Sequence, residues 1–101
     1  MYSLGSGDEP DLLSRVLDGR KLDLSVEKLK HVARLADNLT GGAVVPVVSE
    51  AGGAYNSGQR GFSDTFASAF WYNDLLGALA KHGHAMGCRQ SLLPTHFLGT
   101  S

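Results

Sequence analysis

The chain has 101 residues, of which 43% are hydrophobic and 19% are charged, and its formal net charge is -1. This length fits one domain at most, and the composition is ordinary for a globular protein. The near-neutral balance supplies no overall field that would favour nucleic acid or an acidic membrane surface. The single cysteine, Cys88, excludes an internal disulfide. The opening segment has no basic start and no apolar run, so we predict no signal peptide within this chain.

The first half of the sequence predicts a loop and two helices. Residues 1–9 are polar and glycine-containing, which indicates a loop. Residues 11–17 follow a proline and carry four apolar side chains, which favours a short helix ending at Asp18-Gly19. Ser25 is the expected N-cap of a longer amphipathic helix that Gly41-Gly42 terminates.

The second half predicts a strand, a loop, a helix and another strand. Residues 43–49 are short and valine-rich, which is typical of a buried parallel strand, although Pro46 would be unusual inside a sheet. Glu50 ends this strand, and a small-residue loop follows it. Ser63 is the expected N-cap of a largely buried helix over residues 64–81, and residues 84–90 resemble a final strand.

This order of elements indicates an α/β fold with parallel strands. Two parallel strands do not make an independent sheet, and the apolar faces of both helices require more sheet than two strands provide. We therefore expect residues 1–101 to be a slice of a larger layered or barrel fold. The alternative is an independent small α/β domain.

Several candidate sites fail on their chemistry. The glycines at 53 and 58 have the spacing of a phosphate-binding loop, but Gln59-Arg60 stand where that loop needs lysine and a hydroxyl residue. His82 and His84 form a short pair that is a weak metal signal, and solvation at a helix end is the simpler interpretation. We predict no metal and no cofactor.

Glu50 is the strongest candidate for chemistry. A carboxylate at the carboxyl end of a buried parallel strand lies where α/β barrels keep their active sites. An ordinary loop carboxylate is the alternative. Arg89 and Gln90, at the end of the second predicted strand, are expected on the same face as Glu50 and within reach of a polar ligand.

Three stretches, SEAGGAYNSG, AFWYNDLLGALAKHG and CRQSLL, resemble the plant heparanase-like proteins of glycoside hydrolase family 79 in order and spacing. The opening YSLGSG with DEPDLLSRVLD is also similar to that family, so the resemblance covers roughly residues 2–93. It implies a retaining glycosidase of the β-glucuronidase and heparanase group on a (β/α)₈ TIM barrel. This chain would be the C-terminal part of that barrel, with about strands 7 and 8 and their helices, and no complete domain.

The resemblance also implies roles for individual residues. Glu50 would be the nucleophile. Tyr55, with the backbone of Asn56 and Ser57, would line the pocket for the glucuronic acid carboxylate, and Gln90 would hydrogen-bond the sugar. The substrate would be a glucuronic-acid-containing glycan or a glucuronide. The family implies an extracellular, vacuolar or lysosomal, or peripheral membrane location.

The sequence departs from the family in ways that limit this reading. The acid/base glutamate of the family belongs to an Asn-Glu pair, and no such pair exists here. The Trp-Val-Gly before the nucleophile is replaced by Val47-Val48-Ser49, and the late Gly-Gly-Asn-Tyr by residues 94–97, Pro-Thr-His-Phe. We therefore expect the isolated chain to be inactive, because a complete site needs the missing barrel half. The alternative is a truncated, non-catalytic paralogue that binds a glycan or a protein.

Overall fold

The computed structural model describes residues 1–90 and contains three strands and three helices in that range. In chain order these are β1 (Tyr2–Ser6), α1 (Leu12–Val16), α2 (Gly19–Thr40), β2 (Val47–Tyr55), α3 (Ala67–Lys81) and β3 (Met86–Arg89). Residues 91–101, which include the expected departures at 94–97, lie outside the described part. Among the described helices, none is both long enough and apolar enough to span a membrane.

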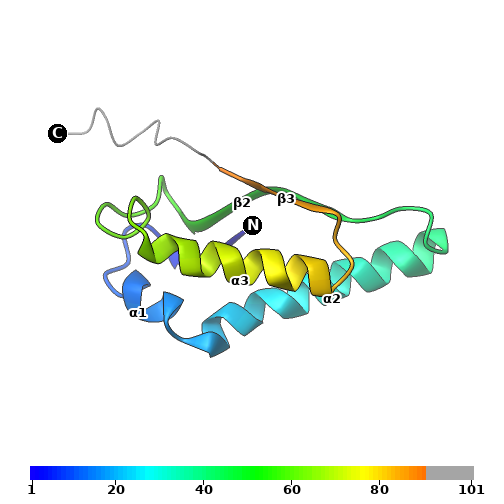
Figure 1. Cartoon of the computed structure of the whole chain (residues 1–101), viewed down its shortest axis with the longest axis horizontal. Helices are drawn as coiled ribbons and strands as arrows, with labels where there is room; N and C mark the ends of the chain where they lie inside the picture. The colour runs from blue at the N-terminus through cyan, green and yellow to red at the C-terminus, as the bar shows by residue number, and fades with distance from the viewer. Residues whose placement is uncertain (91–101) are drawn as a thin grey trace.

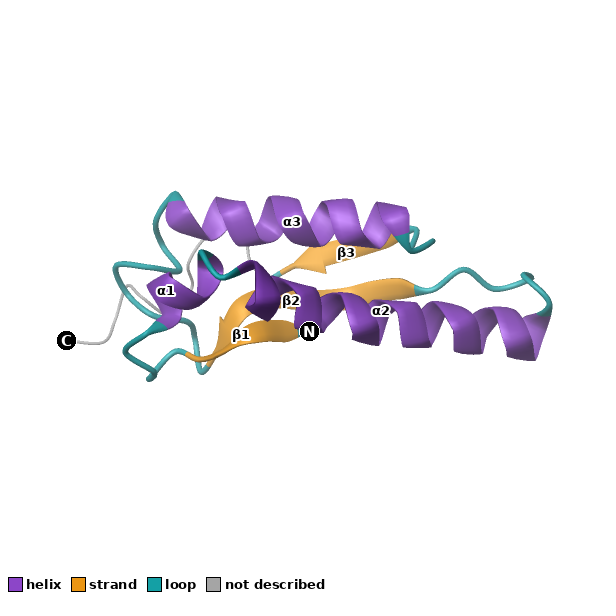
Figure 2. Cartoon of the chain, turned by 90° about the horizontal axis from the view of Figure 1, so that it is seen from below, coloured by secondary structure: helices purple, strands orange, loops and turns teal. Residues whose placement is uncertain are grey.

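The strands form one parallel sheet in the order β1-β2-β3, which confirms the α/β class (Figure 2). Tyr2, at the start of β1, pairs with Gly52, whereas Arg89, at the end of β3, pairs with Ala51. Neighbouring strands are therefore staggered along the sheet. Both pairings contain a register shift, one between Tyr2 and Gly5 and one between Val48 and Ala51.

The expectation of a loop over residues 1–9 is wrong, because Tyr2–Ser6 is a strand. The sequence pattern is short and carries two polar residues and a glycine. Parallel pairing with β2 decides its conformation, and Leu4 enters the core at 2% exposure. The sheet therefore has three strands where the sequence predicted two.

The central strand is also longer and later than predicted. It covers Val47–Tyr55 instead of residues 43–49, so Pro46 precedes it and Glu50 lies inside it. The expected loop at Gly52-Gly53 belongs to this strand, and Gly52 leaves room for the Tyr2 ring. A Cβ atom on Gly52 would lie 2.4 Å from the Tyr2 ring, and one on Gly53 would contact Leu4 and Trp71 at 3.6 Å.

Helix starts differ from the predictions as well. Helix α2 begins at Gly19 because the Asp18 side chain caps it by accepting a hydrogen bond from Arg20 N, while Ser25 is buried inside the helix. Gly41 ends the helix in a left-handed conformation, as predicted. Helix α3 begins only at Ala67. Ser63 Oγ instead accepts a hydrogen bond from Gln59 N, which closes a turn before the helix.

The helices cover one face of the sheet (Figures 1 and 2). Trp71 of α3 is 2% exposed and donates a hydrogen bond to Ser3 Oγ of β1, which joins the two layers. The rest of the core is aliphatic apart from Phe62, and comprises Leu4, Leu12, Val16, Leu29, Ala51, Ala54, Leu75 and Leu79.

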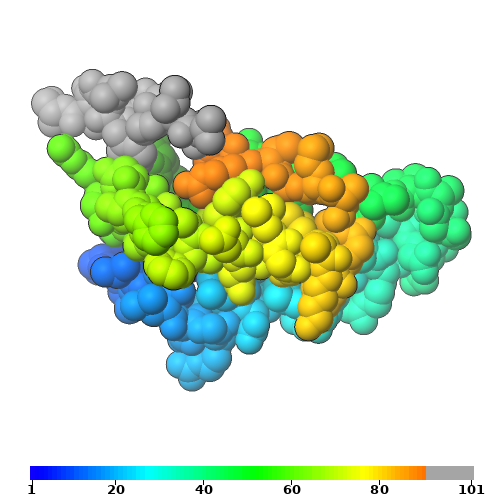
Figure 3. Space-filling model, viewed as in Figure 1, coloured from blue at the N-terminus to red at the C-terminus, as the bar shows by residue number. Residues whose placement is uncertain are grey.

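Large parts of both long helices are uncovered. Phe70 of α3 is 58% exposed, and Phe66, immediately before the helix, is 81% exposed, so the expectation that α3 is largely buried is wrong. The later turns of α2 run past α3 and stand clear of the sheet, and they carry exposed Leu35 and Leu39 (Figures 1 and 3). Three strands do not cover these apolar residues, as the sequence pattern indicated.

We predict that Trp71→Ala lowers the free energy of unfolding by about 3–5 kcal/mol, the usual cost of truncating a buried aromatic residue. Urea unfolding followed by circular dichroism measures the change. Phe70→Ala, one position earlier on the same helix but mostly exposed, is the matched control and should change stability by less than about 0.5 kcal/mol. Equal losses in the two variants would contradict the assignment of Trp71 to the core.

Candidate functional site

Glu50 projects from the middle of β2, on the same side of the strand as Gly52. Residues two apart on a strand share a face, and the Tyr2 ring lies over Gly52, so Tyr2 and Glu50 meet there. The Tyr2 hydroxyl donates a hydrogen bond to Glu50 Oε1. The Met1 ammonium also donates to the Glu50 backbone carbonyl. Glu50 itself is exposed, because no described element covers this face of the sheet.

Gln90 joins the same group from the end of β3. Its side-chain amide lies 2.5 Å from Tyr2 Oη, and its backbone N–H donates to the Ala51 carbonyl at 2.8 Å. A hydroxyl has one proton, and Tyr2 gives it to the carboxylate. The atom of Gln90 at 2.5 Å is its Oε1, so the Gln90 and Glu50 oxygens both lie within reach of the one Tyr2 proton. We call Tyr2, Glu50, Gly52 and Gln90 the carboxylate cluster.

Arg89 does not share this face, contrary to prediction. Its guanidinium lies 5.8 Å from the ring centre of Trp71 and 5.2 Å from that of Tyr72, both on α3. Successive strand residues point to opposite sides, so Arg89 is directed to the helices and Gln90 to the cluster. The arginine thereby anchors the end of β3 to α3 through cation–π contacts.

A second polar group lies where β1 and β2 end, and we call it the rim. It consists of the loop after β1, residues 7–11, and the turn and loop after β2, residues 56–64. Asn56 Nδ2 donates to Asp8 Oδ2 at 2.8 Å and approaches Ser6 Oγ at 3.3 Å. The pKa of the Asp8 carboxyl lies below its ordinary value because Asn56, and then Ser6, donate hydrogen bonds to the ionised form.

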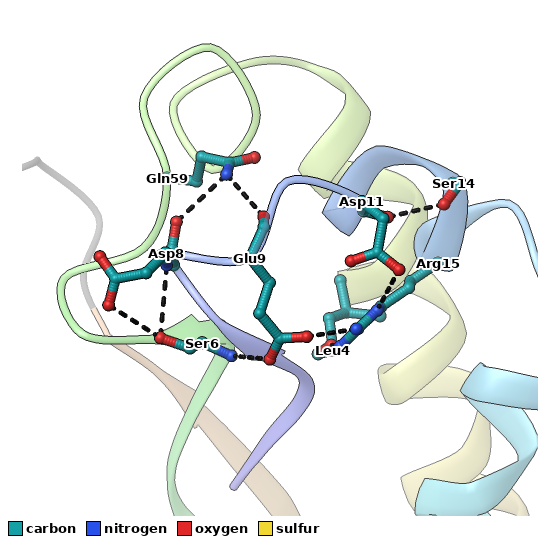
Figure 4. Close-up of polar contacts among 9 residues, drawn as sticks. Leu4, Ser6, Asp8, Glu9, Asp11, Ser14, Arg15 and Gln59 are labelled. Carbon is teal, nitrogen blue, oxygen red and sulfur yellow. Dashed lines mark hydrogen bonds and ion pairs between the residues drawn. The ribbon is translucent and has the colours of Figure 1, made fainter.

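Glu9 and Gln59 hold the rest of the rim in place through hydrogen bonds and one ion pair (Figure 4). Glu9 Oε1 accepts from Ser6 N at 2.9 Å, and its second oxygen pairs with Arg15 of α1. These contacts hold the pKa of Glu9 below its ordinary value, with the Ser6 N–H as the larger cause and Arg15 next. Gln59 Nε2 donates to the carbonyls of Gly7 and Glu9 at 3.1 and 2.8 Å, which joins the two loops.

The structure brings the predicted site residues into two groups rather than one. Glu50 and Gln90 belong to the carboxylate cluster. Asn56 and Ser57 belong to the rim, and Tyr55, the last residue of β2, directly precedes it. No hydrogen bond joins Tyr55 to Glu50 in the described structure, and Tyr55 is 48% exposed.

Sequence reasoning missed Tyr2 and Asp8. Both lie in residues 1–9, for which the sequence predicts a loop, and nothing in one sequence links that segment to β2. The available signal was local: a tyrosine within the opening YSLGSG, which has an apolar residue two positions later. If this stretch is taken as a strand, the Tyr2 hydroxyl is expected beside the sheet.

The histidine prediction is partly wrong. His84 is buried at 7% exposure, with Nδ1 3.3 Å from the His82 carbonyl, so it is not a solvated helix-end residue. Its Nε2 contacts no hydrogen-bond partner among residues 1–90. Within that range, no three histidine, cysteine, aspartate or glutamate side chains gather closely enough to hold a metal ion.

The fold and the cluster define the class of this protein: a parallel α/β chain with a hydrogen-bonded glutamate on an uncovered sheet face and a polar rim at the strand ends. Its family follows from sequence comparison. Residues 1–77 match the profile of the glycosyl hydrolase family 79 N-terminal domain. The chain belongs to glycosyl hydrolase family 79.

Curated relatives agree with this family. Heparanase-like protein 1 of Arabidopsis thaliana is 42% identical over 93 residues, which are 92% of this chain and 17% of that protein. Heparanase-like protein 2 of the same plant is 40% identical over 93 residues, with the same shares. Baicalin-beta-D-glucuronidase of Scutellaria baicalensis is 38% identical over 92 residues, 91% of this chain and 18% of that protein. The chain thus spans less than a fifth of these relatives.

We predict that Tyr2 ionises above the ordinary tyrosine pKa, because its hydroxyl donates to the Glu50 carboxylate and the negative charge there opposes ionisation. The stabilisation from this group is present below the ordinary pKa and is lost as pH rises through the raised value. A tyrosinate absorbance titration measures it. Glu50→Gln should lower the last transition, and Tyr2→Phe should remove it. A curve that Glu50→Gln leaves unchanged would contradict the hydrogen bond.

We also predict that the contribution of the rim to the stability of the fold falls in acid. Asp8 and Glu9 have depressed pKa values, so they stabilise the fold above their ordinary pKa values and lose that effect as pH falls through the depressed ones. Urea unfolding at about pH 6 and about pH 3 measures the slope. The double variant Asp8→Asn, Glu9→Gln should reduce it, and an unchanged slope would exclude a rim contribution.

Proposed function

We propose that residues 1–101 carry the nucleophile part of a retaining glycoside hydrolase of the β-glucuronidase and heparanase type. The observation that carries the proposal is the hydrogen bond from Tyr2 to Glu50 on the uncovered sheet face, in a chain of family 79. A tyrosine proton directed at one carboxylate oxygen fixes the carboxylate in one orientation. Glu50 Oε2 receives no hydrogen bond from residues 1–90, which suits an oxygen that must attack.

In the proposed reaction, Glu50 Oε2 attacks the anomeric carbon of a glucuronic acid unit and forms a glycosyl ester. The glycosidic oxygen leaves with a proton from a second carboxylic acid about 5–5.5 Å away. That acid then removes a proton from water, which hydrolyses the ester and restores Glu50. Tyr2 keeps its proton throughout and holds the carboxylate, while Gln90 lies beside both for hydrogen bonding to the sugar.

The rim suits the carboxylate of the same sugar. Tyr55 stands at the end of β2, and the backbone of Asn56 and Ser57 follows in a turn with positive φ values of 56° and 61°. Backbone N–H groups in such a turn can bind an anion without a positively charged side chain. We assign Tyr55, Asn56 and Ser57 to the glucuronate carboxylate, and the substrate class to glucuronides or glucuronic-acid-containing glycans.

The second carboxylic acid is proposed to lie outside this chain. Asp8 and Glu9 are held by Asn56, Ser6 and Arg15, and the sequence has no Asn-Glu pair. The chain alone should therefore be inactive, because loss of general acid–base catalysis typically costs about 10²–10⁴-fold. By family, we place the whole enzyme outside the cell, in a vacuole or lysosome, or at a membrane periphery.

The uncovered apolar residues favour one alternative. Leu35 and Leu39 of α2 are 48% and 75% exposed, and Phe66, just before α3, is 81% exposed. The remaining barrel half would cover them in the enzyme. A non-catalytic chain would instead use them to bind a protein, or keep the carboxylate cluster for glycan binding alone.

A chimera tests the proposal. The matching 92 residues of this chain replace their counterparts in the Scutellaria baicalin-beta-D-glucuronidase. We expect hydrolysis of baicalin that Glu50→Gln abolishes, with a loss of at least about 10³-fold, because the ester cannot form. Glu27→Gln on α2 is the matched control and should leave the rate unchanged.

Two outcomes would contradict the proposal. A folded chimera that is inactive with Glu50 intact would favour the non-catalytic alternative. An active chimera that tolerates Glu50→Gln would remove Glu50 from the nucleophile role. Turnover by the isolated 101-residue chain would contradict only the expectation that the acid is supplied from outside it.

A further inference from the structure

The turn at Asn56 and Ser57 has a backbone conformation that needs support. Both residues have positive φ, 56° and 61°, and the next residue, Gly58, has φ 76°. Side-chain-bearing residues rarely adopt this region, and serine has no special tolerance for it. Such conformations persist where the surroundings impose them. A neighbouring residue must therefore hold Asn56 and Ser57 in this conformation.

The loop after β1 reaches the turn through side chains. Asn56 Nδ2 donates to Asp8 Oδ2 at 2.8 Å, and Ser6 Oγ donates to the same oxygen at 3.1 Å. The Asp8 backbone N–H donates to Ser6 Oγ at 3.3 Å, which fixes the aspartate relative to the end of β1. Asp8 has no ion-pair partner among residues 1–90, so the Asn56 amide is its main side-chain contact.

The backbone brings the two loops together at the same place. Gly7 N donates to the Tyr55 carbonyl at 2.8 Å. A Cβ atom on Gly7 would lie 1.9 Å from the Gly58 carbonyl oxygen, so only glycine permits this approach. The turn is therefore held at its start by Gly7 and at its first residue by Asp8.

We propose that Asp8 is a positioning residue that fixes the Asn56–Ser57 turn so that its backbone amides face the sugar carboxylate. This inference rests on the proposed function, which assigns that carboxylate to the turn. Asp8 occupies the Asn56 side-chain amide and leaves the backbone N–H groups of Asn56 and Ser57, which donate to no other residue in the range 1–90. An acidic residue thereby supports an anion site without contacting the anion.

Nuclear magnetic resonance on the full 101-residue chain tests this. The variants are Asp8→Ala, the conservative Asp8→Asn, and Asp11→Ala as a control. Asp11 belongs to the same loop, but its carboxylate pairs with Arg15 at 3.0 Å. The readouts are the backbone order parameter at Ser57 and the dissociation constant of free glucuronate, followed at the Asn56 and Ser57 amides. Glucose, which lacks the carboxylate, is the control ligand.

We expect Asp8→Ala to lower the order parameter from about 0.85 toward about 0.6 and to weaken glucuronate binding about tenfold. Asp8→Asn should restore much of both, because its amide oxygen can still accept from Asn56, and Asp11→Ala should change neither. In an Asn56→Gly background, Asp8→Ala should have little further effect, since the shared contact is already gone.

The outcomes separate this inference from the proposed function. An unchanged order parameter in Asp8→Ala would overturn the positioning role. A lowered order parameter in Asp8→Ala, together with no effect of glucuronate on the Asn56 and Ser57 amides, would support the positioning role. It would also count against the proposed carboxylate pocket. If Asp8→Ala does not fold, the Asn56→Gly variant tests the inference by itself. It removes the contact with Asp8, and glycine accepts the positive φ. Unchanged order at Ser57 and unchanged glucuronate affinity there would overturn the inference.

Discussion

The contact of the Tyr2 ring with Gly52 is the constraint on which the rest of the site depends. The ring fits only because position 52 lacks a side chain. It places the phenol hydroxyl against the Glu50 carboxylate and beside Gln90. Tyr2 of β1, Glu50 of β2 and Gln90, directly after β3, thus meet on one face. The stagger of the strands makes this possible, because the start of β1 and the end of β3 lie at the same level of β2.

Successive strand residues point to opposite faces of the sheet, so one face carries the carboxylate cluster and the other packs against α3. On one side of the sheet, Gly53 and Arg89 face the α3 aromatics, and Trp71 links α3 to Ser3 of β1. On the other side, Glu50 and Gln90 face away from the helices. A one-residue slip of β3 would exchange Arg89 and Gln90 between these faces. The cation–π contacts of Arg89 therefore help to keep Gln90 in the cluster.

The described part of the chain leaves one face of its sheet and parts of two helices uncovered. The chain spans 17–18% of its curated relatives, and its sheet has two edges and one face without cover in the described structure. Parallel strands are normally buried on both faces. Glu50 lies on such a face and is exposed within residues 1–90. Leu35 and Leu39 of α2 and Phe70 of α3 are exposed as well.

The sequence by itself determined the α/β class, the three helices and the helix end at Gly41. These follow from hydrophobic periodicity and from local glycine chemistry, which neighbouring residues encode. Tertiary structure alone decided that Tyr2–Ser6 is a strand, that Gly52 and Gly53 belong to β2, and that Tyr2 contacts Glu50 and Asp8 contacts Asn56. Each of these depends on contacts between residues about 50 positions apart, and no local pattern records them. A glycine at a tight packing contact and a glycine in a loop look the same until the opposing ring is in place.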